Sequence, residues 1–143
     1  MIIPTDAMHV ENNTRLKPGT YYVPNGLDIL EDGITLDGSG AVLVGKAHNG
    51  TAVRLHNRKN VTIKNLRIMN YKYGIEAKRC QQIAVEACCI RDTAEVQANT
   101  IFLDVWRNVE QSYGGGILLD HVTDSLVQNC DLQHQMTGLH AYH

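Results

Sequence analysis

The sequence predicts an all-β solenoid, because short runs of alternating apolar residues recur along the chain at fixed spacings. Steps of 22, 42 and 22 residues separate four equivalent positions, Val53, Ile75, Ile117 and Leu139. The same spacing relates Val61, Ile83 and Ser125; Ile63, Val85 and Val127; Leu66, Cys88 and Cys130; and Ile68, Ile90 and Leu132. The 42-residue step is one coil plus about 20 residues. We therefore expect about four to five coils of about 22 residues, one of which carries an inserted loop of about 20 residues.

Each coil is predicted to contain three short strands, since its apolar residues alternate with a period of two rather than with the period of a helix. In the coil with the clearest pattern, a polar turn over residues 56–60 follows the first strand. The three strands of that coil cover residues 52–55, 61–63 and 66–68.

A tight corner is expected between the second and third strands of each coil. Asn65, Ala87 and Asn129 occupy it in successive coils. Asparagine tolerates left-handed backbone geometry and hydrogen-bonds to nearby backbone, so it suits this position. Ala87 interrupts the row.

The chain is predicted to form a single β-helix domain, residues 1–143, with opening strands in 1–32, coils in 33–143 and the inserted loop in 92–114. Residues 17–23 and 27–29 are interpreted as strands of an opening coil, and residues 33–44 as a further, less regular coil. The last residues supply only the first strand of a new coil. Because the open end of a solenoid needs a cover, we expect the remaining coils of a longer chain to follow.

The bulk composition excludes several classes of partner. The 13 basic and 15 acidic residues give a net charge of -2, which offers no electrostatic basis for binding nucleic acid. Apolar residues never run to the roughly 18 needed to cross a bilayer, so no membrane insertion is predicted. The first residues of the chain also lack the pattern of a signal peptide.

The four cysteines show no metal-binding spacing such as C-x-x-C. Cys88 and Cys130 occupy equivalent positions on neighbouring coils, which parallel strands place about 4.8 Å apart. They are interpreted as two buried thiols in a core row, although a disulfide would also fit that separation.

Residues 61–68, 73–75 and 80–88 resemble the right-handed parallel β-helix repeat of the pectate-lyase-like superfamily, and the resemblance covers roughly residues 17–143. Residues 102–106 and 113–117 look like a bacterial subgroup of these repeat proteins. The resemblance implies a right-handed, single-stranded parallel β-helix that binds substrate along the face of its first strands. It also implies that the full-length protein is extracellular or periplasmic. No catalytic motif of the superfamily can be carried over residue by residue.

Two rows of side chains are expected to point outward from the first strands. One row holds Arg54, Glu76, Leu118 and His140, and the other holds His56, Lys78, Asp120 and Tyr142. Rows repeating at the strand spacing suit an extended polymer with recurring units. The alternative is that Arg54 with Glu76, and Lys78 with Asp120, form ordinary cross-strand ion pairs.

These rows contain candidate catalytic groups. Glu76 and Asp120 could provide the two carboxylates that a glycosidase requires. A lyase would instead use Lys78 or Arg54 as a cationic base, with the two carboxylates as Ca²⁺ ligands. No cofactor is otherwise predicted.

Further candidates lie in or beside the inserted loop. Asp104, Trp106 and Tyr113 could contact sugar, or the apolar residues of the loop could only fasten it to the stack. Asp92 and His134 occupy equivalent positions on neighbouring coils, so they form either an acid–base pair or an exposed turn. His121 and His143 also stack, with His140 nearby, but no metal site is predicted from them.

The sequence therefore predicts a domain that binds or modifies polysaccharide, as a lyase, hydrolase or epimerase would, in the first-strand groove beside the loop. The alternative is a non-catalytic solenoid that displays its loops to a protein or metal partner. Whether the protein is an enzyme stays open at this point.

Overall fold

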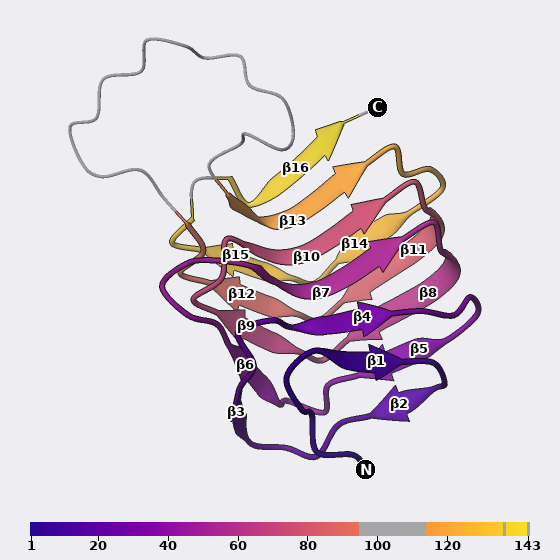
Figure 1. Ribbon diagram of the computed structural model, residues 1–143. Helices are drawn as coiled ribbons and strands as arrows, with labels where there is room; N and C mark the ends of the chain where they lie inside the picture. The colour runs from indigo at the N-terminus through magenta and orange to yellow at the C-terminus, as the bar shows by residue number, and fades with distance from the viewer. Residues whose placement is uncertain (95–113, 136, 143) are drawn as a thin grey trace, which may run out of the picture.

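The computed structural model describes residues 1–94, 114–135 and 137–142, which fold into three parallel sheets that share one narrow core (Figure 1). The first sheet stacks the first strands of the coils: β1 (Met8–Val10), β4 (Leu27–Ile29), β7 (Thr51–His56), β10 (Tyr73–Lys78), β13 (Gly115–Asp120) and β16 (Leu139–Tyr142). The second stacks β2 (Thr14–Arg15), β5 (Thr35–Asp37), β8 (Lys59–Lys64), β11 (Gln81–Glu86) and β14 (Leu126–Gln128). The third stacks β3 (Thr20–Tyr22), β6 (Val42–Val44), β9 (Arg67–Met69), β12 (Cys89–Arg91) and β15 (Asp131–Gln133).

Successive coils lie one above another along the stack, with the two chain ends at opposite ends of it (Figure 1). From β1 to β13, each strand pairs in parallel with the strand three elements later, as β7 does with β10. The described residues thus form five coils of three strands and the first strand of a sixth. The prediction of an all-β parallel β-helix is confirmed.

The predicted ladder of apolar residues also lies where the spacing places it. Ile75 pairs with Val53 on one side and with Ile117 on the other, and Ile117 pairs with Leu139. In the second sheet, Val85 pairs with Ile63 and with Val127. Because strand side chains alternate between faces, this register sends every second residue into the core.

Left-handed backbone makes the corners. Asn65, Ala87 and Asn129 have φ angles of 55°, 52° and 54°, which confirms the predicted corner between second and third strands. A further row of residues in the same conformation ends the third strands, formed by Asn70, Asp92 and His134, with φ angles of 68°, 52° and 52°. Asn, Asp and His adopt this region more readily than other non-glycine residues, which explains their use here.

The N-terminal part differs from the prediction. Residues 27–29 do not belong with 17–23; they begin the coil that continues through β5 and β6. Strands β1, β2 and β3 form a coil of their own before it. Met8 pairs with Leu27, 19 residues later, and Leu27 pairs with Val53, 26 residues later. These offsets depart from the 22-residue step, so the first coil carries no readable repeat.

The cysteines all carry free thiols. Cys88 is buried and Cys130 is half-buried, so the interpretation as core thiols fits and no disulfide joins them. Within the described residues, no helix has the length and apolar character required to cross a membrane.

Candidate functional site

The outer face of the first-strand sheet carries the two predicted rows in register. Glu76 lies opposite Arg54 and Leu118, and Lys78 lies opposite His56 and Asp120. His140 and Tyr142 continue the two rows on β16. The structure also extends the first row toward the N-terminus, since Asp28 lies opposite Arg54 and His9 opposite Asp28.

Arg54 is held by the coil before it rather than by Glu76. Its Nε and one terminal nitrogen donate to the two carboxylate oxygens of Asp28, at 2.6 and 3.2 Å. The guanidinium also donates to the backbone oxygens of Asn25 at 2.6 Å and Thr51 at 3.2 Å. This two-pronged pair with four hydrogen bonds fixes the side chain. Sequence reasoning missed Asp28 because it gave strand 27–29 no register.

Glu76 is the best-held carboxylate of this face. Lys78 Nζ lies 2.9 Å from Oε1 and His56 Nε2 lies 3.5 Å from the same oxygen, while the Thr51 hydroxyl donates to Oε2 at 3.0 Å. Lys78 reaches Glu76 because residues two apart on a strand share a face. The alternative pairing of Lys78 with Asp120 is therefore not the one formed.

The environment of Glu76 keeps it ionised. Burial raises the pKa of this carboxyl, but the hydrogen bond and charge of Lys78, the Thr51 hydroxyl and the charge of His56 outweigh it, so the pKa lies below its ordinary value. A carboxylate in this state accepts hydrogen bonds.

The face is less open than its sequence pattern suggested. Glu76 and Asp120 were expected to face solvent, yet only 13% and 15% of their side chains is exposed. Each is drawn onto the sheet by a neighbour; for Asp120 this is His121, whose Nδ1 lies 2.6 Å from Oδ1. Leu118, in the same outward row, is only 1% exposed.

The aromatic residues of this face lie near its C-terminal strand. The rings of His140 and Tyr142 have centroids 4.3 Å apart and are tilted by 33°. Tyr73, at the start of β10, is buried, and its burial, with smaller effects of Tyr142 and Glu76, raises its pKa to about 12. The face thus combines a held carboxylate, cations and rings.

Asp92 and His134 are brought together. With His48 and Thr93 they line a small cavity of about 160 Å³ beside the turns that follow β12 and β15. The Thr93 hydroxyl donates to Gln135 Oε1 at 3.0 Å. Their left-handed φ angles give both residues a structural reason to be there, independent of any acid–base role.

Three candidates, Asp104, Trp106 and Tyr113, lie outside the described residues. So does His143, the partner proposed for His121. Among residues 1–94, 114–135 and 137–142, no group of three or more His, Cys, Asp or Glu side chains could hold a metal ion.

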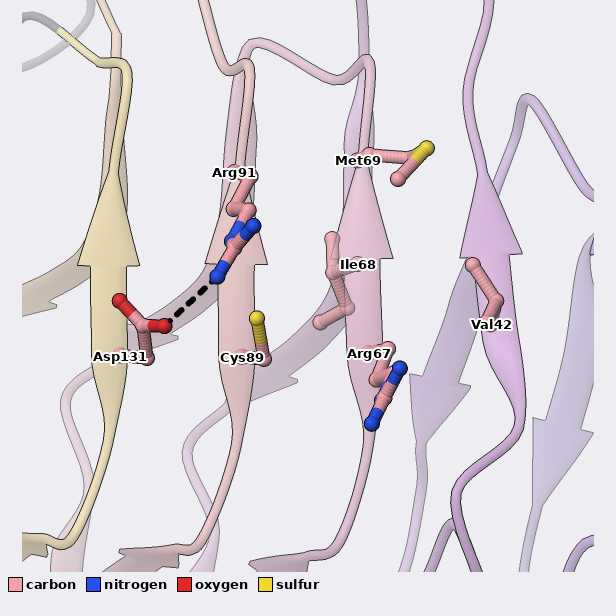
Figure 2. A pocket seen from close by; sticks show the side chains of 7 residues that line it. All are labelled: Val42, Arg67, Ile68, Met69, Cys89, Arg91 and Asp131. Carbon is pink, nitrogen blue, oxygen red and sulfur yellow. Dashed lines mark hydrogen bonds and ion pairs between the residues drawn. The ribbon is translucent and has the colours of Figure 1, made fainter.

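A second cavity, of about 320 Å³, lies on the outer face of the third-strand sheet, which sequence reasoning did not consider (Figure 2). Its lining residues are Val42, Arg67, Ile68, Met69, Cys89, Arg91 and Asp131. The signal was present, since Arg67, Cys89 and Asp131 stand between aligned core residues in three successive coils and must therefore point outward.

No protein-family model, no curated protein and no solved structure matches this chain. The parallel β-helix is therefore established by the strand pairing of the chain itself.

Proposed function

We propose that this chain binds an extended polysaccharide along its first-strand face and that it is a distant member of the pectate-lyase-like superfamily. The observation that carries the proposal is the unbroken register of the two outward rows across β7, β10, β13 and β16. Parallel strands repeat every 4.8 Å or so, which presents polar groups to a polymer at regular intervals. A glycan of this kind would place the full-length protein outside the cytoplasm.

The residues of this face supply the contacts that sugar recognition needs. Glu76 is an ionised acceptor for hydroxyl groups, and Lys78 and His56 beside it offer donors. His140 and Tyr142 add ring surface that can pack against the apolar face of a sugar. Together they lie on three neighbouring strands and the one beyond, so a bound chain would run along the stack.

Binding is favoured over cleavage. A glycosidase needs one carboxylic acid with a raised pKa to protonate the leaving group, and the pKa of Glu76 is lowered. A lyase needs a free base, and Lys78 is engaged by Glu76 at 2.9 Å. Lyase, hydrolase or epimerase chemistry would require groups beyond these two.

Titration calorimetry with polygalacturonate, alginate and a neutral glucan tests the proposal. We expect one of these polymers to bind and Glu76→Gln to weaken it several-fold, because the neutral amide loses charge-assisted hydrogen bonds. The matched control is Glu86→Gln, which changes the same residue type on the second-strand face, where Glu86 accepts from Gln128.

Trp106→Ala and Asp120→Asn extend the test to the inserted loop and to the second row. If no polymer binds, or if binding is indifferent to all three changes, the proposal is wrong and the alternative of a non-catalytic display scaffold replaces it.

A further inference from the structure

The groove on the third-strand face is built from the outward residues of four neighbouring strands. Arg67 on β9 lies opposite Val42 on β6 and opposite Cys89 on β12, and Cys89 in turn lies opposite Asp131 on β15. Met69 and Arg91 form the parallel row two residues further along. Figure 2 shows the guanidinium of Arg91 turned along its strand toward Asp131, with Arg67 and Met69 projecting from the next strand.

The groove carries more positive charge than it neutralises. One terminal nitrogen of Arg91 donates to Asp131 Oδ2 at 2.8 Å, and Gln133 Nε2 donates to the other oxygen at 2.6 Å. Arg67 is exposed and, among the residues that the structure describes, has no side-chain hydrogen bond or ion pair. Two guanidinium groups thus share one carboxylate, which already has its acceptors in use.

Arg91 also holds a donor that is shut off from solvent. Its Nε is buried and has no hydrogen-bond partner within the described parts of the chain. Buried donors in folded proteins are almost always paired, because an unmade hydrogen bond costs free energy. An acceptor oxygen arriving at Arg91 would satisfy this donor.

We propose that this groove is an oxyanion-binding site, in which Arg67 and Arg91 hold a carboxylate or sulfate group while the ligand's apolar flank lies on Val42 and Met69. Guanidinium groups pair with planar and tetrahedral oxyanions through charge-assisted hydrogen bonds. Met69 is 36% exposed and Val42 is partly exposed, so the wall next to the cations is apolar. An acidic sugar ring has both features, an oxyanion and an apolar ring face.

The site is independent of the first-strand face, because it lies on a different sheet and shares no residue with it. A glycan could therefore engage one face without the other. The two proposals are told apart by their variants, since Glu76→Gln changes only the first-strand face and Arg67→Gln changes only the groove.

The test titrates the whole chain with four probes: an oligouronate, a sulfated oligosaccharide, a neutral oligosaccharide and inorganic sulfate. Two signals report on the groove, the NMR resonance of the Arg91 Nε–Hε group and the rate at which Cys89 is alkylated. Cys130 is half-buried like Cys89 but does not line the groove, so its alkylation rate is the internal control.

We expect an acidic probe to shift the Arg91 resonance and to slow alkylation of Cys89 at least about fivefold, with Cys130 unchanged. The carboxylate and sulfate probes distinguish which oxyanion the groove prefers, and inorganic sulfate alone shows how much the apolar flank adds. Arg67→Gln should weaken binding about tenfold, as expected for the loss of one charged contact. Arg79→Gln removes the same charge from an exposed turn elsewhere and should leave binding unchanged.

Three results would overturn the proposal. These are an Arg91 resonance that stays in place at saturating acidic probe, equal binding of the neutral oligosaccharide, and unchanged binding after Arg67→Gln. If Arg67→Gln has no effect while Glu76→Gln weakens binding, the groove proposal fails and the first-strand proposal stands. The reverse pattern overturns the first-strand proposal alone.

Discussion

The middle coil and the C-terminal coil have the same apolar positions but bury them differently. In the middle coil, formed by β10, β11 and β12, the inward residues Ile75, Val85 and Ile90 are all inaccessible to solvent. In the next coil, Ile117 is equally buried, whereas the corresponding Val127 and Leu132 are only partly buried. The difference lies in how many neighbours each strand has.

Ile117 has a paired strand on both sides, β10 and β16, while β14 and β15 are last in their sheets among the described strands. A parallel β-helix thus buries a residue only where coils lie above and below it. The same apolar letter in the repeat therefore carries a different stability in each coil, and substitutions at equivalent positions measure that difference.

The largest expected effect comes from placing a charge in the middle ladder. Val85→Asp puts a carboxylate into a fully buried row with no partner, which should lower the free energy of unfolding by about 4 kcal/mol. Val127→Asp at the equivalent position should cost about 1 kcal/mol, because water reaches it. Chemical denaturation of the two variants measures both values.

Glu86→Ala is the control, since it changes the neighbour of Val85 without touching the core. It should alter stability by less than about 1 kcal/mol. Equal losses for the two Asp variants would show that burial does not differ between the coils.

The thiols repeat the comparison kinetically. Burial, with smaller effects of neighbouring groups, raises the pKa of Cys88 to about 12, while its C-terminal equivalent Cys130 is half-buried. Since the thiolate is the reactive form, Cys130 should be alkylated by iodoacetamide far faster than Cys88 in the native protein. Peptide mass spectrometry after timed quenching gives both rates.

In denaturant the two thiols should react at similar rates, because the difference arises from the fold. If Cys88 reacts as fast as Cys130 under native conditions, the middle coil opens more readily than its packing implies.

The middle coil should also be the acid-sensitive part of the first-strand face. Because the pKa of Glu76 is lower in the folded state, the unfolded chain binds the proton more readily, and this contribution is lost as the pH falls below the ordinary value of 4.5. Glu76→Gln should therefore flatten the fall in unfolding free energy between about pH 6 and about pH 3.

Thr51→Val, which removes only the hydroxyl donor, should flatten the curve by a smaller amount. The measurement is a series of denaturation curves across this pH range. A wild-type slope in the Glu76→Gln variant would mean that other carboxylates cause the acid sensitivity.

The same difference between regions explains how far the sequence could be interpreted. From residue 51 onward the 22-residue spacing predicts the strand register residue by residue, as for Ile75 between Val53 and Ile117, because stacked strands require equal offsets. In the first coil the offsets are unequal, so strands 8–10 and 14–15 leave no periodic signal.

The site was predictable only as rows of residues. Register places Glu76 between Arg54 and Leu118, but it does not say which way a long side chain turns. Arg54 reaches back to Asp28, and Lys78 folds onto Glu76, through rotamer choices that spacing does not encode. Burial of Leu118 in an outward row is likewise a property of the folded surroundings.

The smallest expected effect lies at the corner row. Ala87 has a φ of 52°, a region that costs an ordinary residue about 1 kcal/mol and that asparagine adopts more readily. Ala87→Asn should therefore stabilise the middle coil by about 0.5 kcal/mol, and Asn129→Ala should destabilise the C-terminal coil by a similar amount. Both residues are named by the same position of the repeat, so a thermal or denaturant unfolding series compares them directly. Opposite signs for the two changes are the expected result. A loss of stability in Ala87→Asn would show that packing at this corner, where Ala87 N donates to Gln128 O at 3.1 Å, outweighs the backbone preference.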